Sequence, residues 1–541
     1  MSTKKISVFI LAMVLTMPLL KAQYVDEARQ LIEKERYISV ETLLEKTIET
    51  SEPGPEINYL LIKTYLEQDK KDEAGIYISR HLEPTLYGNT DPLNRIAYAR
   101  YLLNTGNKKT AEGIFTSILS NKKSHKNAVL LLAMAEVAIE EENGDAKPAL
   151  DWLDMAEKRD RDNAAIDMAR GLAYRKLNDA SNAYLAYQNA IKKDPDNVRA
   201  HYLMGKIFVA QKNPEAYLQY FKKAYAIDST YAPVLEELYN HYYSRDVRIA
   251  KTYLKKFIAN TDYSLRNDYY LTDIFYLNSE FQNAIQLANS IIAKEASKAQ
   301  PRLYKLIAYS YLNSGDSVKA LQYITDYFTK ENPVKVIAAD FQLIAQLTEK
   351  IPGQEEGAIA YYSIAADMDT LRSNKADYAA AIAGLYTRKE NHSKQALWLG
   401  KVYEWKEKTN NIDLFNWGLA HYMAKEFRKT DSIFEIYTTL YPDDIYGYYW
   451  RAQANASIDS SMTGSLAVPF YYKVVEIGEK NKEISKKMLL KAYGYLGGYE
   501  ANVTKNYPAS LLWFEKYITI EENADVAKYI EMLQKWIAEK N

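Results

Sequence analysis

Apolar and polar positions recur with the period of amphipathic α-helices, and the helical pattern itself repeats along the chain. The stretch 164–229 shows this most clearly, because small and aromatic residues return after 34 residues. The matching pairs are Gly171 and Gly205, Tyr174 and Phe208, Tyr187 and Phe221, and Ala190 and Ala224. Self-similarity at a period of about 20 to 50 residues indicates stacked structural repeats rather than one globular core.

Each repeat is expected to contain two antiparallel helices. Gly171 and Tyr174 lie three residues apart and therefore share one face of a first helix. Ala183 and Ala190 belong to an i, i+4, i+7 pattern that predicts a second helix. Residues 177–179 (Leu-Asn-Asp) separate the two, because Asn and Asp favour turns over the interior of a helix. Small residues on the facing sides allow the two backbones to approach closely.

Six residues of this stretch resemble the signature of the tetratricopeptide repeat (TPR) family. They are Gly171, Tyr174, Ala183, Tyr187, Ala190 and Pro195. The resemblance implies antiparallel helix pairs stacked into a right-handed superhelix, with a concave groove that typically binds peptides or proteins. The next unit departs from the family at Tyr217, where alanine is usual, and at Ser229, where proline is usual.

Comparable helix pairs follow one another along the chain. The predicted fold class is therefore all-α, an α-solenoid over residues 23–541 with about twelve TPR-like helix-turn-helix repeats. The clearest repeats cover 164–229, 301–333 and 411–442. A polar-faced helix over 524–540 is expected to cap the last exposed seam. The Ser-rich insertion 458–464 is expected to be an exposed loop.

The first 22 residues have the pattern of a secretory signal peptide. Lys4 and Lys5 precede an apolar run over 6–20, and cleavage is expected before Gln23. The alternative is an uncleaved membrane anchor, but this run is shorter than the ~20 residues that span a bilayer. No cysteine follows the run, which excludes a lipid-anchored lipoprotein. We expect export to the periplasm or cell envelope, with no membrane span after cleavage.

Charge and composition exclude several classes of function. The chain has 69 Lys and Arg against 70 Asp and Glu, without the clustered basic residues that nucleic-acid binding needs. It contains no cysteine, so disulfides and cysteine-ligated metals are impossible. Its six histidines include no helical zinc motif, and phosphate-binding loops and nucleophile elbows are missing. The sequence therefore predicts a protein without catalytic residues, cofactor or metal, that is, not an enzyme.

Candidate partner-binding residues follow from the resemblance. In TPR proteins the groove is lined mainly by positions 2, 5, 9 and 12 of each first helix. On this chain, such positions include Arg175, Arg199, Tyr202, Lys206, Asn240, Tyr243, Arg302, Lys305 and Tyr309. Two pairs, Tyr202 with Lys206 and Lys305 with Tyr309, lie four residues apart on one helix face. Such pairs suit an extended peptide or an acidic terminus, although long cations also solvate ordinary helix surfaces.

Two functional hypotheses follow. The first is an exported, non-enzymatic scaffold that binds a protein or peptide partner in the cell envelope through its concave groove. The second is a helical-repeat protein that binds a glycan or small nutrient, since aromatic rings stack on sugars and the chain has 48 tyrosines. The sequence leaves open the identity of the partner, the groove segment used and the oligomeric state.

Overall fold

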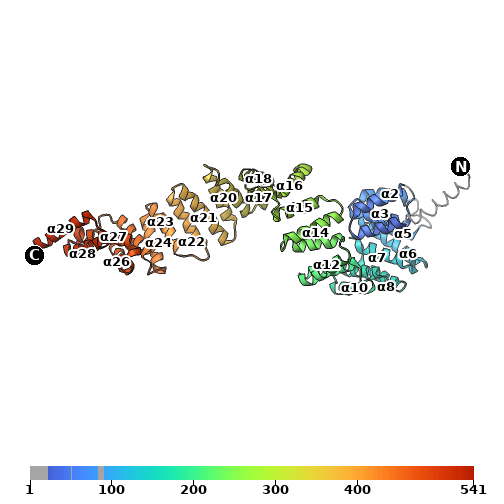
Figure 1. The fold of residues 1–541 in the computed structure, drawn as a ribbon. Coiled ribbons are helices and arrows are strands. Elements are labelled where there is room, and N and C mark those ends of the chain that lie inside the picture. Colours follow the sequence, from blue (N-terminus) through green and yellow to red (C-terminus); the bar gives the residue numbers. More distant parts are fainter. Residues whose placement is uncertain (1–21, 50–51, 83–90, 541) are drawn as a thin grey trace. The chain divides into compact units, whose positions relative to one another are not determined.

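The computed structural model describes residues 22–49, 52–82 and 91–540. Within these ranges the protein is all-α and has no β-strand, which confirms the predicted fold class (Figure 1). The predicted signal peptide lies outside the described residues except for its last position. Contacts divide the chain into two compact units, Met1–Ala299 (unit 1) and Gln300–Asn541 (unit 2).

Unit 1 begins with a helix over residues 22–33. It continues with α2 (Tyr37–Ile48), α3 (Pro55–Glu67), α4 (Lys71–His81), α5 (Pro92–Asn104), α6 (Lys108–Ser120), α7 (Ala128–Glu140), α8 (Ala146–Glu157), α9 (Ala164–Lys176), α10 (Ala180–Lys193), α11 (Val198–Ala210), α12 (Pro214–Ile227), α13 (Ala232–Tyr242), α14 (Val247–Asn260), α15 (Leu265–Leu277) and α16 (Phe281–Glu295). Each first helix is followed by a short turn and its second helix.

Unit 2 repeats this alternation of first and second helices. Its helices are α17 (Arg302–Asn313), α18 (Ser317–Lys330), α19 (Ala338–Thr348), α20 (Glu355–Met368), α21 (Arg372–Arg388), α22 (His392–Trp405), α23 (Asn411–Met423), α24 (Phe427–Leu440), α25 (Ile445–Ile458), α26 (Val468–Gly478), α27 (Lys482–Tyr499), α28 (Tyr507–Ile520) and α29 (Ala524–Lys540). The Ser-rich stretch 458–464 lies at the connection between α25 and α26. No described helix is both long and apolar enough to span a bilayer.

A glycine on the first helix and a ring on the second bring the helices of a pair together. A Cβ added to Gly171 would lie 2.2 Å from the ring of Tyr187, and one added to Gly418 would lie 2.5 Å from Phe434. Both rings are fully buried. The small and aromatic positions of the sequence repeat therefore mark the contact between the two helices, as the spacing predicts.

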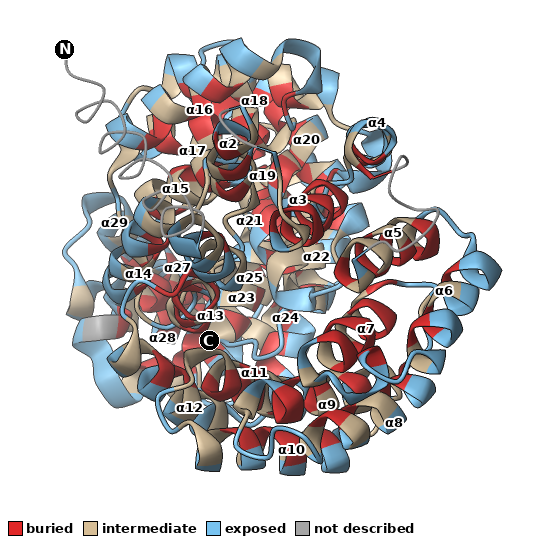
Figure 2. Ribbon diagram, turned by 90° about the vertical axis from the view of Figure 1, so that its right-hand side faces the viewer, coloured by how far each residue is buried: buried red, intermediate tan, exposed pale blue. Residues whose placement is uncertain are grey.

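The turn between the two helices also recurs. Asn178, Lys212, Glu390 and Lys425 all have positive φ angles of 52–61° directly after a first helix. One left-handed residue ends the first helix and redirects the chain toward the second. In unit 1, Figure 2 shows the second helices α6, α8 and α10 on the outer side of the first helices α5, α7 and α9. First helices therefore form the concave side.

The last helix covers the end of unit 2. Ile530 and Leu533 of α29 are buried and pack with Phe514 of α28. The opposite side of α29 stays exposed, including Met532. One amphipathic helix thus ends the stack, because its apolar side packs on the last pair and its other side faces solvent.

Candidate functional site

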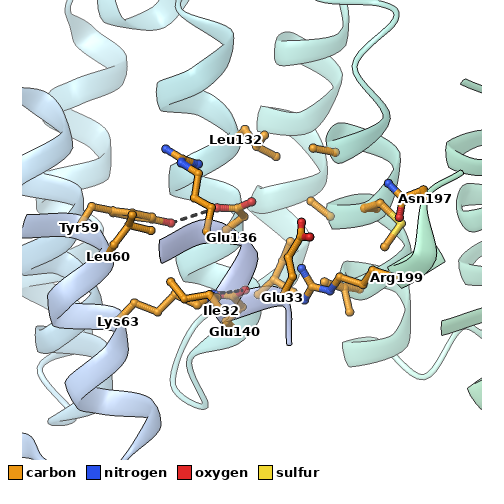
Figure 3. Close-up of a pocket in the computed structure, with 16 residues that line it drawn as sticks. Ile32, Glu33, Tyr59, Leu60, Lys63, Leu132, Glu136, Glu140, Asn197 and Arg199 are labelled. Atoms are coloured by element: carbon orange, nitrogen blue, oxygen red, sulfur yellow. Dashed lines mark hydrogen bonds and ion pairs between the residues drawn. The ribbon is translucent and has the colours of Figure 1, made fainter. Parts of the chain in front are cut away.

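The first helices of unit 1 enclose a cavity on the concave side. Its walls come from α3, α7, α9 and α11 together with residues 29–33 (Figure 3). A first chamber of about 230 Å³ joins a second of about 480 Å³, and the two share Ile32, Glu33, Lys63, Ile139, Glu140, Leu172 and Arg199. The second chamber also reaches Tyr202 and Tyr231. Charged and aromatic side chains therefore face one continuous space.

Two polar contacts connect α3 to α7 across this cavity. The Tyr59 hydroxyl donates to Glu136 at 3.1 Å, and Lys63 Nζ lies 2.6 Å from Glu140 (Figure 3). Within each helix the two side chains are four residues apart, so they lie on one face. The contacts therefore run side by side along the cavity wall.

Arg100 of α5 extends this network into the core. Its side chain is fully buried, and its guanidinium donates to Glu140 at 2.8 Å and to Glu141 at 3.0 Å. Burial alone would raise the pKa of Glu140, but the charges and hydrogen bonds of Lys63 and Arg100 lower it well below its usual range. Glu140 therefore remains ionised between its two cations.

Three carboxylates of the second chamber have no such partner. Glu33, Glu35 and Glu67 make no side-chain hydrogen bond or ion pair with any residue that the structure describes. Each side chain is exposed to solvent. The surrounding protein nevertheless removes part of the water around the carboxyl group, and this desolvation raises its pKa above the ordinary glutamate value. These side chains can accept hydrogen bonds from a ligand.

Arg199 is the cation that acts on two of these carboxylates, Glu33 and Glu35. It lines both chambers, and Figure 3 shows its guanidinium near Glu33. Burial would lower its pKa, but the acidic groups around the cavity, Glu140 foremost, raise it. Arg199 therefore stays charged, and no hydrogen bond of its guanidinium occurs among the described residues.

The structure places three of the predicted partner-binding residues of unit 1 on the cavity wall. Arg175, Arg199 and Tyr202 line the second chamber. Lys206 instead forms an ion pair with Glu237 of α13, and its Nζ lies 6.0 Å from the centre of the Tyr202 ring. The structure therefore brings Tyr202 to the cavity, while the charge of Lys206 is already neutralised.

The other two predicted residues of unit 1 lie outside the cavity lining. Asn240 of α13 is exposed. Tyr243 follows α13, and its ring packs 5.7 Å from that of Tyr239. Tyr239 itself is buried in the core of the α13–α14 pair. Tyr243 is thus placed beside this helix pair rather than in the cavity.

The three predicted residues of unit 2 lie on α17. Lys305 forms a 2.9 Å ion pair with Asp340 of α19, and Asp340 also accepts a hydrogen bond from Tyr327 at 3.0 Å. Arg302 Nε donates to Gln300 at 2.9 Å. Tyr309 is half-buried against the core between α17 and α19. Lys305 therefore links neighbouring first helices.

The groove positions 2, 5, 9 and 12 of the TPR family also point to two cavity residues that were not among the predicted ones. Tyr59 and Lys63 occupy positions 5 and 9 of α3, counted from Pro55, which are groove positions in the family. Their helix belongs to a repeat that matches the family signature at fewer positions, which makes this register harder to recognise in the sequence. The partners Glu136 and Glu140 lie 77 residues further along the chain, and nothing in the sequence pattern pairs them.

The buried histidines have structural partners. His201 Nε2 lies 3.0 Å from the Pro195 carbonyl oxygen, and His421 Nδ1 lies 2.6 Å from Glu426. Burial lowers the pKa of both rings. No group of three or more His, Asp or Glu side chains among the described residues could hold a metal ion. The two histidines therefore take part in local packing and hydrogen bonding.

Comparison with known proteins finds similarity to TPR repeats in part of this chain. Residues 171–212 match the family model described as TPR repeat. Curated protein sequences give no match. The C-terminal part of a TPR repeat-containing protein from Cytophaga hutchinsonii is 27% identical and covers 48% of this chain and 97% of its own, with a TM-score of 0.32.

Two further solved structures are similar at lower identity. A tetratricopeptide repeat protein from Parabacteroides merdae is 16% identical, covering 52% of this chain and 96% of its own, with a TM-score of 0.21. Yeast Tom70 is 14% identical, covering 75% of this chain and 96% of its own, with a TM-score of 0.29. The chain is therefore an α-solenoid of stacked helix pairs, of which residues 171–212 match the TPR repeat.

Proposed function

We propose that this protein is an exported, non-enzymatic scaffold that binds an extended segment of a partner protein in the concave cavity of unit 1. The observation on which the proposal depends is the cavity itself. Its wall holds Arg199, Tyr202 and three carboxylates without internal partners, Glu33, Glu35 and Glu67. A groove lined by first helices is also where TPR proteins bind peptides.

The mixture of charges favours a peptide over a small apolar ligand. An extended peptide presents backbone N–H donors and C=O acceptors along its length. Carboxylates accept from the donors, while Arg199 and the tyrosine hydroxyls donate to the acceptors. Lys63 and Glu140 are already paired, so they shape the wall without needing a ligand. The partner therefore gains its hydrogen bonds from the side chains that lack internal ones.

Export is a separate part of the proposal. It is supported by the basic, then apolar pattern of residues 1–22 and by the small residue before Gln23. Expression of the full chain in a Gram-negative host, followed by fractionation and N-terminal sequencing, tests it. A periplasmic product that starts at Gln23 is expected. A cytoplasmic product that retains residues 1–22 would rule out export.

Peptide binding is tested by selection from a library of random twelve-residue peptides, with affinities measured by fluorescence anisotropy. Arg199→Ala combined with Tyr202→Ala should weaken the selected peptides at least about tenfold, because Arg and Tyr dominate interface energies. Arg248→Ala combined with Tyr263→Ala is the matched control, because both residues are exposed and lie outside the cavity lining.

The same preparation distinguishes the scaffold from the glycan-binding alternative. Equal binding by the cavity variant and the control would place the peptide site elsewhere. Binding to an oligosaccharide array that is lost in the cavity variant, without any selected peptide, would replace the proposal with glycan recognition. Aromatic rings stacked on sugar would then be the main contact.

A further inference from the structure

Helix α2 begins without a cap of its own. Its N-cap residue Arg36 makes no side-chain capping bond, and its first turn contains no acidic residue. The missing acceptor comes from Asp262, in the turn between α14 and α15. Asp262 Oδ2 accepts from the backbone N–H groups of Ile38 at 2.8 Å and Ser39 at 3.2 Å. A residue 224 positions downstream therefore caps this helix.

A second set of contacts lies beside the first. Ser39 Oγ donates to Asp262 Oδ1 at 2.5 Å, and Arg36 Nε lies 3.5 Å from the same oxygen. Lys34 Nζ lies 3.0 Å from Asp228 and donates to Thr230 at 2.8 Å, in the turn between α12 and α13. The turn that joins residues 22–33 to α2 thus contacts two distant turns of unit 1.

The helix over residues 22–33 and α2 form a pair, and the opposite side of this pair is held by apolar contacts. Ala28, Val40 and Leu44 are fully buried in a core that also contains residues of α3. One side of the pair is therefore fixed by apolar burial, and the other by partly exposed polar contacts. Exposed ion pairs contribute little individually, so the polar side is the one that separates at lower cost.

Closure of the polar side encloses the cavity. Ile32 and Glu33, at the end of the first helix, lie between Lys63 and Arg199 in Figure 3. Tyr37 of α2 and Glu35 of the turn line the second chamber. Movement of the pair away from Asp228 and Asp262 would therefore remove one wall of both chambers.

We propose that residues 22–48 form a gate over the concave cavity of unit 1, held closed by Asp262 and Asp228. Separation of these contacts opens the cavity while the apolar contacts to α3 remain. What enters through the gate rests on the proposed peptide-binding function, but the opening itself does not. The gate is thus a property of the protein without its partner.

The native chain has no cysteine, so two labels can be placed without background. Spin labels on Glu27→Cys and Lys223→Cys, both exposed, report the distance between the gate and α12 by pulsed electron resonance. With the native contacts, one narrow distance distribution is expected. Asp262→Ala should add a longer-distance population, with the ratio of open to closed rising about fivefold to tenfold, the usual effect of losing a helix cap.

Asp246→Ala is the matched control. Asp246 also caps a helix, accepting from the Arg248 and Ile249 N–H groups at 3.0 and 3.1 Å, but it serves only its own helix α14. This variant should leave the distance distribution narrow. If it opens the gate as much as Asp262→Ala, or if Asp262→Ala leaves the distribution unchanged, the gate does not exist.

A second variant guards against unfolding. Asp262→Asn keeps one acceptor oxygen but loses the charge, and should give an open population between those of the native residue and Asp262→Ala. Circular dichroism shows whether each variant remains helical. If Asp262→Ala unfolds, an unchanged distribution in the helical Asp262→Asn variant overturns the proposal. Because no peptide is added, failure of peptide binding does not affect the result.

Discussion

The two units each contain a polar link between first helices, and the links differ in their exposure to water. In unit 1, Arg100 is fully buried and is shared between Glu140 and Glu141. In unit 2, Lys305 is partly exposed and forms an ion pair with the buried Asp340. A buried ion pair owes its energetics to desolvation as much as to attraction. Removal of one partner should therefore cost much more stability in unit 1 than in unit 2.

The largest effect is expected for Arg100→Ala. It leaves Glu140 and Glu141 without their shared cation, and breaking a buried pair costs about 3–5 kcal/mol. Denaturant titration with hydrogen exchange of the α3, α5 and α7 amides measures this loss in unit 1. Arg248→Ala, an exposed control, should stay within about 0.5 kcal/mol of the native protein. A loss below about 1 kcal/mol for Arg100→Ala would remove the contrast between the units.

Asp340→Ala should weaken unit 2, but by less. It removes the acceptor of Lys305 and Tyr327 and the bond to the Ile337 N–H, for a loss of about 3 kcal/mol at most, because Lys305 can be solvated. Hydrogen exchange of α17 and α19 measures the change. The control Asp316→Ala loses only exposed contacts, the cap of α18 and the ion pair with Lys319, and should cost less than Asp340→Ala. A larger effect for Asp340→Ala than for Arg100→Ala would reverse the comparison.

Matched glycine variants test what the units share. Gly171→Ala places a methyl group 2.2 Å from the Tyr187 ring, and Gly418→Ala places one 2.5 Å from Phe434. In both variants the free energy of unfolding should fall by about 2 kcal/mol, because the added methyl group overpacks the contact. Thermal unfolding with local hydrogen exchange compares them. A loss in one unit only would show that the helix pairs are not built alike. Gly113→Ala, where a Cβ meets nothing within 4 Å, is the control.

The smallest effect concerns Glu33 at the cavity. Burial raises its pKa, so its contribution to stability is present below its unfolded pKa of about 4.3 and is lost as pH rises through the folded pKa. Glu33→Gln should therefore gain slight stability over the native protein between pH 4 and 7. Urea unfolding across this range measures the difference. A difference that shrinks with rising pH would contradict the raised pKa.

The fold could be predicted from the sequence because its determinants are local. Gly171 and Tyr187 meet within one helix pair, so their spacing alone reveals the contact. The spacing is less informative at 445–478, although α25 and α26 pair as the others do. The Ser-rich connection between them interrupts the usual spacing. The residue spacing therefore reveals a repeat only where the connection between its two helices has the usual length.

The site could be predicted only in part, because its contacts are long-range. Arg199 and Tyr202 follow from their register on a first helix. The Lys63–Glu140 pair does not, since α3 and α7 are separated along the chain by α4, α5 and α6 and meet only through the curvature of the stack. The cap that Asp262 gives to α2 is more remote still. The curvature of the stack is the sum of small rotations between many repeats, so it cannot be inferred from the sequence of any single repeat.

The position of Asp262 also has a consequence for the order of folding. During synthesis, α2 leaves the ribosome well before its cap, because the Asp262 carboxylate follows only after more than two hundred further residues. Short helices without tertiary contacts are marginal in water. Helix α2 therefore reaches its final state only after Asp262 has been made, and in a chain truncated before Asp262 this helix would lack its cap.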